Sequence, residues 1–150
     1  MPVLALNLEE VDFRSKSGSG GPIAGRVWFI VGEIAFPELG WCDFPASVWC
    51  SAVEAFSELS QGANEAFSYF FDGPYYLYFK KSSISGDVIE VEASTDRAGV
   101  PELLASTSLR LNELRTALLR PVESSAITLL VEAGDPVIAQ LVAYLRATEV

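Results

Sequence analysis

Acids and tyrosines are the side chains on which any chemistry in this chain of 150 residues would depend, because it contains no histidine. Histidine is the usual general base and a common zinc ligand. A catalytic site or a zinc site in this chain would therefore lack the residue type most often found there. Two converging carboxylates would suffice for glycoside hydrolysis, and Glu90 and Glu92 are the nearest pair. On a strand, residues two apart lie side by side, which is equally true of any solvated strand face. We therefore expect no catalytic residue.

Other motifs that carry chemistry are also missing. Asp72 follows a predicted strand, but Asp72-Gly73-Pro74 is foremost a turn sequence, because aspartate bonds its own backbone and glycine accepts a positive φ. Ser17–Gly21 is glycine-rich, yet neither a Lys-Ser/Thr pair nor a helix follows it, as a phosphate-binding loop requires. Cys42 and Cys50 do not form a metal-ligand set; we expect buried free thiols, and the alternative is a disulfide between them. We expect neither a metal nor a cofactor.

A binding surface is better supported than a catalytic one. Side chains alternate along the predicted strand Tyr75–Lys81, so its apolar residues face those of the next strand, Asp87–Ser94, on one side of a sheet. The opposite side then carries tyrosines and glutamates, and tyrosine is enriched at protein interfaces. The alternative is a sheet face that the C-terminal helices cover. The predicted partner contacts on this face are Tyr76, Tyr78, Glu90 and Glu92.

A second candidate contact is the loop Pro37–Phe44, which holds Trp41 with Glu38 and Asp43 beside it. An exposed tryptophan in such a loop would serve as a binding anchor. The alternative, which we favour, is that Trp41 folds back onto the core. Asp43 is also a candidate N-cap for the following helix, whose first turn tolerates Pro45.

Hydrophobic periodicity predicts the elements that position these residues. Alternation and turn residues predict strands first, one inserted helix and helices last, which is the order of a single α+β domain over residues 1–150. We expect one antiparallel sheet of about six strands, an N-terminal hairpin plus a four-strand meander, and two to three C-terminal helices. Gly32 is expected to mark a bulge or a close backbone approach within the second strand. The predicted strands are Val3–Phe13 (with a bulge near Glu9 and Glu10), Gly25–Phe36, Glu65–Asp72, Tyr75–Lys81, Asp87–Ser94 and Leu103–Leu111; the predicted helices are Asp43–Ser60, Asn112–Arg120, a segment from Pro121 through Ala133, and one after Pro136.

The charge distribution narrows the class of partner. The net charge is −10, and Val27–Phe79 contains seven carboxylates but no Lys, Arg or His. Nucleic acids and anionic membranes are bound through Lys and Arg, so neither is an expected partner. A basic protein partner fits this charge, as does solubility alone. The start of the chain lacks a basic segment typical of a signal peptide and no apolar run is long enough for a membrane span, so we expect a cytoplasmic protein.

Two short stretches resemble a known group of proteins. The stretch Phe36-Pro37-Glu38-Leu39-Gly40-Trp41-Cys42-Asp43-Phe44 leads into a helix bearing Trp49, and Tyr69-Phe70-Phe71-Asp72-Gly73-Pro74-Tyr75 follows. This pattern is similar to small bacterial domains of unknown function, several of them classed as immunity-like proteins of toxin–antitoxin loci. The match covers about residues 36–80. The resemblance implies a stoichiometric binder of a partner protein and supplies no catalytic residue.

Three functional hypotheses follow. The first is a non-catalytic acidic protein that occludes a basic protein partner, such as a toxin or a nuclease. The second is a structural or assembly subunit that forms a homo-oligomer through the edge or the tyrosine face of its sheet. The third, a carboxylate-based enzyme, requires a concave pocket with two converging acids.

Overall fold

The computed structural model describes residues 4–9, 24–84, 87–123 and 136–148, which form an α+β fold of two antiparallel sheets and three α-helices. In the first sheet the strand order is β1-β2-β3, and β4 also pairs with β2. The second sheet is a meander with the order β5-β6-β7-β8. The strands are β1 (Leu4–Glu9), β2 (Gly25–Val31), β3 (Ile34–Phe36), β4 (Cys42–Asp43), β5 (Glu65–Tyr69), β6 (Tyr75–Lys81), β7 (Val88–Arg97) and β8 (Val100–Arg110).

Two four-stranded sheets replace the single sheet of about six strands, so that prediction was wrong. The predicted strand Gly25–Phe36 is a hairpin in which Gly32 and Glu33 turn the chain between β2 and β3. Gly32 has a φ of +65°, which glycine adopts at little cost, so it permits a turn rather than a bulge. The four-strand meander is confirmed as the second sheet. The strand predicted over residues 10–13 lies outside the described residues.

The predicted inserted helix is confirmed as α1 (Pro45–Ser60). Its apolar residues recur at helical spacing, so Trp49, Val53 and Phe56 are fully buried along one face. The N-cap residue is Phe44 rather than the predicted Asp43. Two further helices and a short 3₁₀ turn follow: α2 (Leu111–Leu119), η2 (Arg120–Glu123) and α4 (Pro136–Ala147). The helical segment predicted through Ala133 lies mostly outside the described residues.

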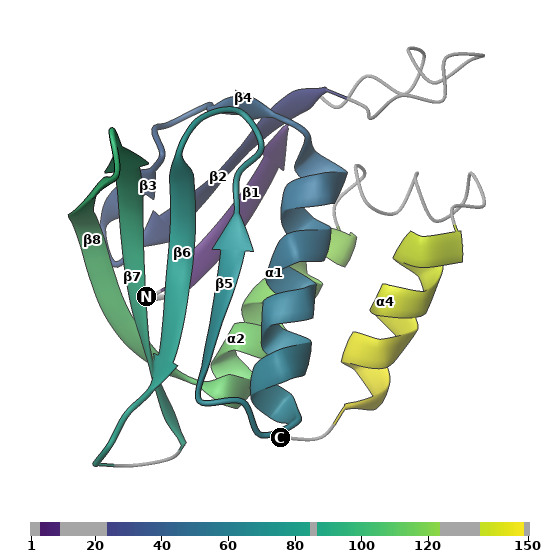
Figure 1. Cartoon of the computed structure of the whole chain (residues 1–150). Helices are drawn as coiled ribbons and strands as arrows, with labels where there is room; N and C mark the ends of the chain where they lie inside the picture. The colour runs from purple at the N-terminus through teal and green to yellow at the C-terminus, as the bar shows by residue number, and fades with distance from the viewer. Residues whose placement is uncertain (1–3, 10–23, 85–86, 124–135, 149–150) are drawn as a thin grey trace.

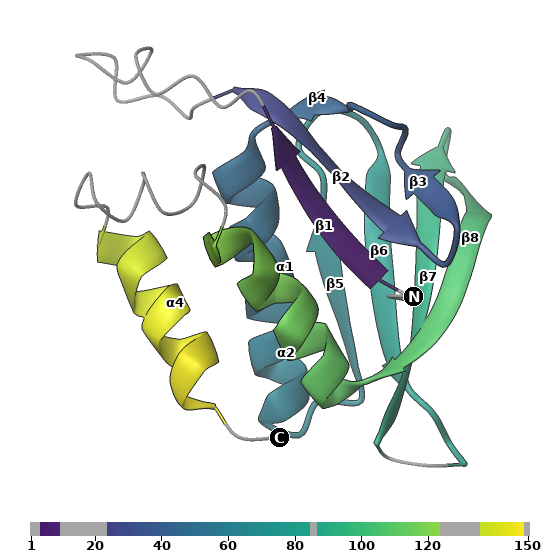
Figure 2. The ribbon, with the colours of Figure 1, turned by 180° about the vertical axis from the view of Figure 1, so that it is seen from behind.

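One hydrophobic core joins both sheets and the helices. Figure 1 shows the second sheet in front of the first, with α1 lying beside β5. From behind, Figure 2 shows α2 beside β1 and α4 on the far side of the helices from the second sheet. Phe29 of the first sheet meets Phe70, just after β5, edge-on at 5.9 Å between ring centroids. The outer face of the second sheet, toward the viewer in Figure 1, is therefore not covered by any described helix.

None of the described helices combines the length and the apolar content that crossing a bilayer requires. Cys42 and Cys50 are not joined in a disulfide, as predicted, but Cys42 is exposed rather than buried and Cys50 is only partly buried.

Candidate functional site

The outer face of the second sheet carries the predicted tyrosines and glutamates. The register of β6 and β7 pairs Tyr78 with Glu92 and places Lys80 opposite Glu90. Because side chains alternate across a strand, these residues and Tyr76 stand on the same side of the sheet. Tyr76 and Tyr78 are partly exposed. The described parts of the C-terminal helices do not cover them (Figures 1 and 2).

Strand β5 adds two rings that were not among the predicted contacts. Phe67 pairs with Tyr78 and Tyr69 with Tyr76 in the register of β5 and β6. Phe67 is 39% exposed and Tyr69 51% exposed. The Phe67 ring lies 4.9 Å from Tyr78, 6.2 Å from Tyr69 and 6.1 Å from Tyr76, measured between centroids. We call these four residues, Phe67, Tyr69, Tyr76 and Tyr78, the aromatic face.

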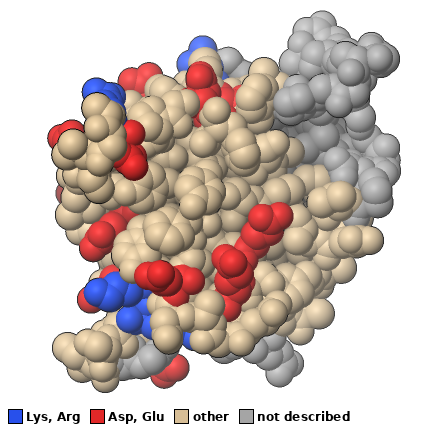
Figure 3. Space-filling view, in the orientation of Figure 1, with Lys and Arg blue, Asp and Glu red and all other residues tan. Residues whose placement is uncertain are grey.

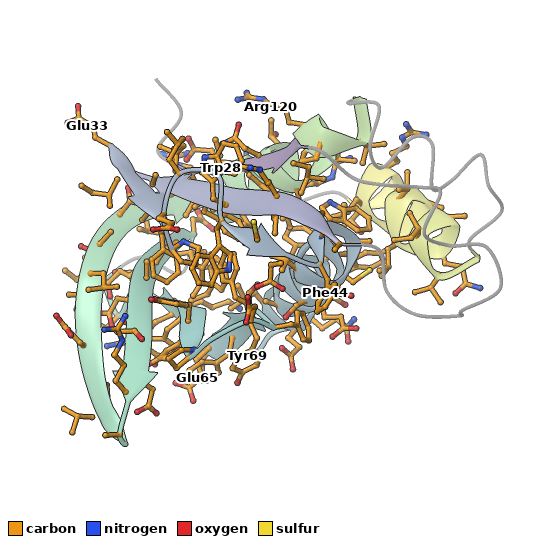
Figure 4. All side chains as sticks on the ribbon, turned by 90° about the horizontal axis from the view of Figure 1, so that it is seen from above. Trp28, Glu33, Phe44, Glu65, Tyr69 and Arg120 are labelled. Carbon is orange, nitrogen blue, oxygen red and sulfur yellow. The ribbon has the colours of Figure 1, made fainter. Side chains whose placement is uncertain are left out.

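Carboxylates flank the aromatic face on both sides. Figure 4 shows Glu65 and Tyr69 projecting from β5 in the same direction. The hydroxyl of Tyr78 donates a hydrogen bond of 2.6 Å to Oε2 of Glu65. Glu90 and Glu92 stand on β7, and Lys80 lies between Glu65 and Glu90 in the strand register. Three carboxylates with a single ammonium among them make this a negatively charged surface with exposed rings, which suits cationic groups.

The bond between Tyr78 and Glu65 leads to a testable prediction. That hydrogen bond raises the pKa of Tyr78 above its ordinary value of 10.0, as do burial and the negative charges of Glu65 and Glu92. A raised pKa in the folded state means that this contribution to stability is complete below about pH 10 and is lost as the pH rises through the folded pKa. We expect the substitution Glu65→Gln to lower the titration midpoint of Tyr78, measured as the ultraviolet absorbance of phenolate.

Two further variants assign that titration. Tyr78→Phe should remove the highest titration step from the absorbance curve, which identifies it with Tyr78. Glu54→Gln removes a carboxylate that is not among the groups acting on Tyr78, so the midpoint should stay in place. A midpoint that responds equally to Glu54→Gln and Glu65→Gln would contradict the assigned cause.

The loop candidates occupy a different part of the molecule. The indole of Trp41 donates its Nε1–H to Oδ2 of Asp43 at 3.1 Å and meets the Tyr75 ring edge-on at 5.1 Å. Trp41 is thus partly buried against the core, the alternative favoured above, and does not project as an anchor. Glu38 is exposed at the turn, where its carbonyl accepts the backbone N–H of Trp41.

Asp43 is 4% exposed, and its carboxylate is engaged within the molecule. Besides the indole of Trp41 it accepts the backbone N–H groups of Phe44 at 2.8 Å, of Phe71 at 3.1 Å and of Asp72 at 3.0 Å. These bonds tie the turn after β5 to the start of α1. Asp43 therefore organises the fold and presents no free acceptor to a partner.

Over the residues that the structure describes, no group of three or more acids and cysteines is placed to hold a metal ion. Glu90 and Glu92 stand on an open strand face beside Tyr78 rather than inside a cleft. No family model, curated protein or solved structure matches this chain.

Proposed function

We propose that this protein is a non-catalytic binding protein that occludes a basic partner protein through the aromatic face and the carboxylates beside it. The aromatic face carries the proposal, because four contacting rings on an uncovered sheet face supply large, rigid contact area. Aromatic side chains lose little conformational entropy on binding, and clustered ones commonly dominate interface energetics. Rings that were needed only for folding would be directed into the core, as Phe79 is.

The negative charge of this surface indicates which class of protein it would bind. Glu65, Glu90 and Glu92 border the rings, and the whole chain carries a net charge of −10. Opposite charges accelerate the encounter of two proteins, whereas desolvated rings slow dissociation. An acidic surface of this kind favours a partner rich in Lys and Arg.

The resemblance to immunity-like domains extends the proposal to the partner's class. Residues 70–74, which carry part of this resemblance, lie in the connection that follows β5, next in the chain to Tyr69 of the aromatic face. A toxin that acts on nucleic acid carries the basic footprint that phosphate binding requires. Such an enzyme would be inhibited when this acidic face covers its substrate site.

Affinity capture followed by kinetics tests this proposal. The purified chain is immobilised, proteins of the native host are passed over it, and the retained protein is identified. We expect a basic protein whose association rate falls as the salt concentration rises. Glu90→Lys should lower the association rate about tenfold at low salt, because it reverses a charge beside the rings.

The matched control is Glu33→Lys, which reverses the charge of another exposed glutamate. Figure 4 shows Glu33 on another side of the molecule, well away from Glu65 and Tyr69. This variant should bind with a rate close to that of the unmodified chain. Equal effects of the two substitutions, or an acidic retained protein, would argue against the proposed face.

A further inference from the structure

A groove lies beside the aromatic face, between β5, α1 and α4. It has a volume of about 840 Å³, and its walls and floor come from α1, from β5, which follows it closely in the chain, and from α4, which is far from both in sequence. The wall formed by α4 is held in place, since the hydroxyls of Tyr144 and Ser60 are hydrogen-bonded at 2.7 Å. Its lining includes Glu54 and Glu58 of α1, Glu65, Phe67 and Tyr69 of β5, and Tyr144 of α4.

One wall of the groove is the outer edge of β5, which among the described strands pairs with β6 alone. The backbone N–H of Phe70 bonds toward β6, to the carbonyl of Tyr75 at 3.1 Å. The N–H of Tyr69 points the other way and donates to Oγ of Ser51 at 2.9 Å. Because these directions alternate along a strand, the N–H and C=O groups of Phe67 face the groove.

Helix α1 covers this edge at Tyr69, through the bond to Ser51, but at Phe67 the edge opens into the groove without the sequence features that usually hinder strand addition. Exposed edge strands are commonly blunted by proline, by lysine or by bulges. The opposite edge of the same sheet follows that rule, because β8 contains Pro101 and its pairing with β7 shifts register between Ala93 and Ser94. In contrast β5 reads Glu-Ala-Phe-Ser-Tyr, without proline or lysine and with a regular register.

The charge of the groove identifies its occupant. Glu54, Glu58 and Glu65 line it, and no Lys or Arg is among the described residues that do. Figure 3 shows carboxylates in a row over α1 and another beside β5. A second copy of this chain would bring acids of the same sign against these acids. A strand rich in Lys would place its cations against them instead.

We infer that the outer edge of β5 binds an extended, lysine-rich segment of the partner as an additional strand, by hydrogen bonds to the backbone of Phe67. This deepens the proposed function and rests on it in one respect, the basic character of the partner. Backbone hydrogen bonds supply affinity in such a complex, while alternate side chains of the added strand supply specificity. The added strand would extend the outer surface that bears Phe67 and Tyr69.

A synthetic peptide tests the inference without knowledge of the partner. The probe is an acetylated and amidated octapeptide of alternating lysine and valine, and binding is followed by nuclear magnetic resonance on the labelled chain. We expect saturable binding that weakens with salt and slows hydrogen exchange of the Phe67 amide. A probe of alternating glutamate and valine should not bind.

Two substitutions of Phe67 distinguish binding through the backbone of the β5 edge from binding through the aromatic side chains. Phe67→Val removes the ring but keeps the amide, whereas Phe67→Pro removes both. Proline is tolerated on an edge strand where the N–H faces away from the sheet, and thermal unfolding checks that the fold is retained. We expect Phe67→Pro to bind the probe about tenfold more weakly than Phe67→Val, because one backbone acceptor of the peptide loses its donor. A probe N-methylated at alternate residues should bind the unmodified chain with a similar loss.

Each other result overturns the inference. Equal binding by Phe67→Val and Phe67→Pro, together with tolerance of N-methylation, would assign recognition to rings and charge alone and leave the proposed function standing. Failure of the lysine peptide to bind would exclude the edge as a site for basic strands, while the Glu90→Lys kinetics would still decide the aromatic face. A concentration-dependent dimer in sedimentation that Phe67→Pro dissociates would make a second copy the occupant.

Discussion

Replacement of Trp49 by alanine is expected to lower the free energy of unfolding by about 4 kcal/mol, which is within the range for deletion of a large buried aromatic side chain. Trp49 has no exposed surface and is the largest fully buried side chain of the fold. Its indole Nε1–H also donates to the carbonyl of Leu118 at 2.9 Å, which links α1 to α2. The substitution therefore creates a cavity and leaves a buried carbonyl without its donor. Urea unfolding followed by circular dichroism measures the loss.

Two further variants distinguish the effect of the cavity from the effect of the lost hydrogen bond. Trp49→Phe keeps most of the apolar volume but not the donor, and we expect a loss of about 2 kcal/mol. Trp41→Ala removes the same side chain from a partly buried site and should cost less than Trp49→Ala. If the two alanine variants lost the same stability, the central place of Trp49 in the core would be contradicted.

Elements whose signals are local could be predicted from the sequence. The helix α1 was predicted because its apolar residues recur at helical spacing and because Pro45 marks its start. The meander could be predicted in the same way, since alternation and short turns specify each of its hairpins. These features depend on residues near one another in the chain, which the sequence displays directly.

The division into two sheets depends on contacts that no local signal specifies. Strand β2 is apolar on both faces, which indicates a central strand but does not reveal which sheet contains it. The structure places β2 centrally, between β1 and β3, and packs Phe29 against Phe70 instead of hydrogen-bonding the two segments. Packing of two sheets and pairing within one sheet bury the same apolar residues, so composition and alternation cannot distinguish them.

The candidate site was predicted only in part, because local signals place some of its residues and not the others. Alternation within β6 and β7 was sufficient to place Tyr76, Tyr78, Glu90 and Glu92 on one face. Phe67 and Tyr69 could have been added by carrying the register of the hairpin back across the turn at Asp72. The groove could not be predicted, because one of its walls is α4, which is far from β5 in sequence and carries no local signal of its place beside that strand.

Asp43 has a wider role than the N-cap position predicted for it, which Phe44 occupies instead. It was predicted as an N-cap, and its carboxylate does accept the N–H of Phe44 at 2.8 Å. The same carboxylate also accepts two backbone amides that are 28 and 29 residues further along the chain. Those amides, of Phe71 and Asp72, belong to the turn that sets the register between β5 and β6. Asp43 is therefore expected to fix the arrangement of the aromatic face, although it lies outside it.

We expect Asp43→Ala to lower the free energy of unfolding by about 3 kcal/mol, because it leaves three backbone donors and one indole donor without their acceptor. Asp43→Asn retains one acceptor oxygen and should lose about half as much. Urea unfolding measures both, and hydrogen exchange of the Phe71 and Asp72 amides should become faster in both variants. The matched control is Asp72→Ala, which removes an exposed aspartate from the same turn and should change stability by less than about 0.5 kcal/mol. Unchanged exchange at Phe71 in Asp43→Ala would show that the turn is held by other contacts, and the aromatic face would then not depend on this carboxylate.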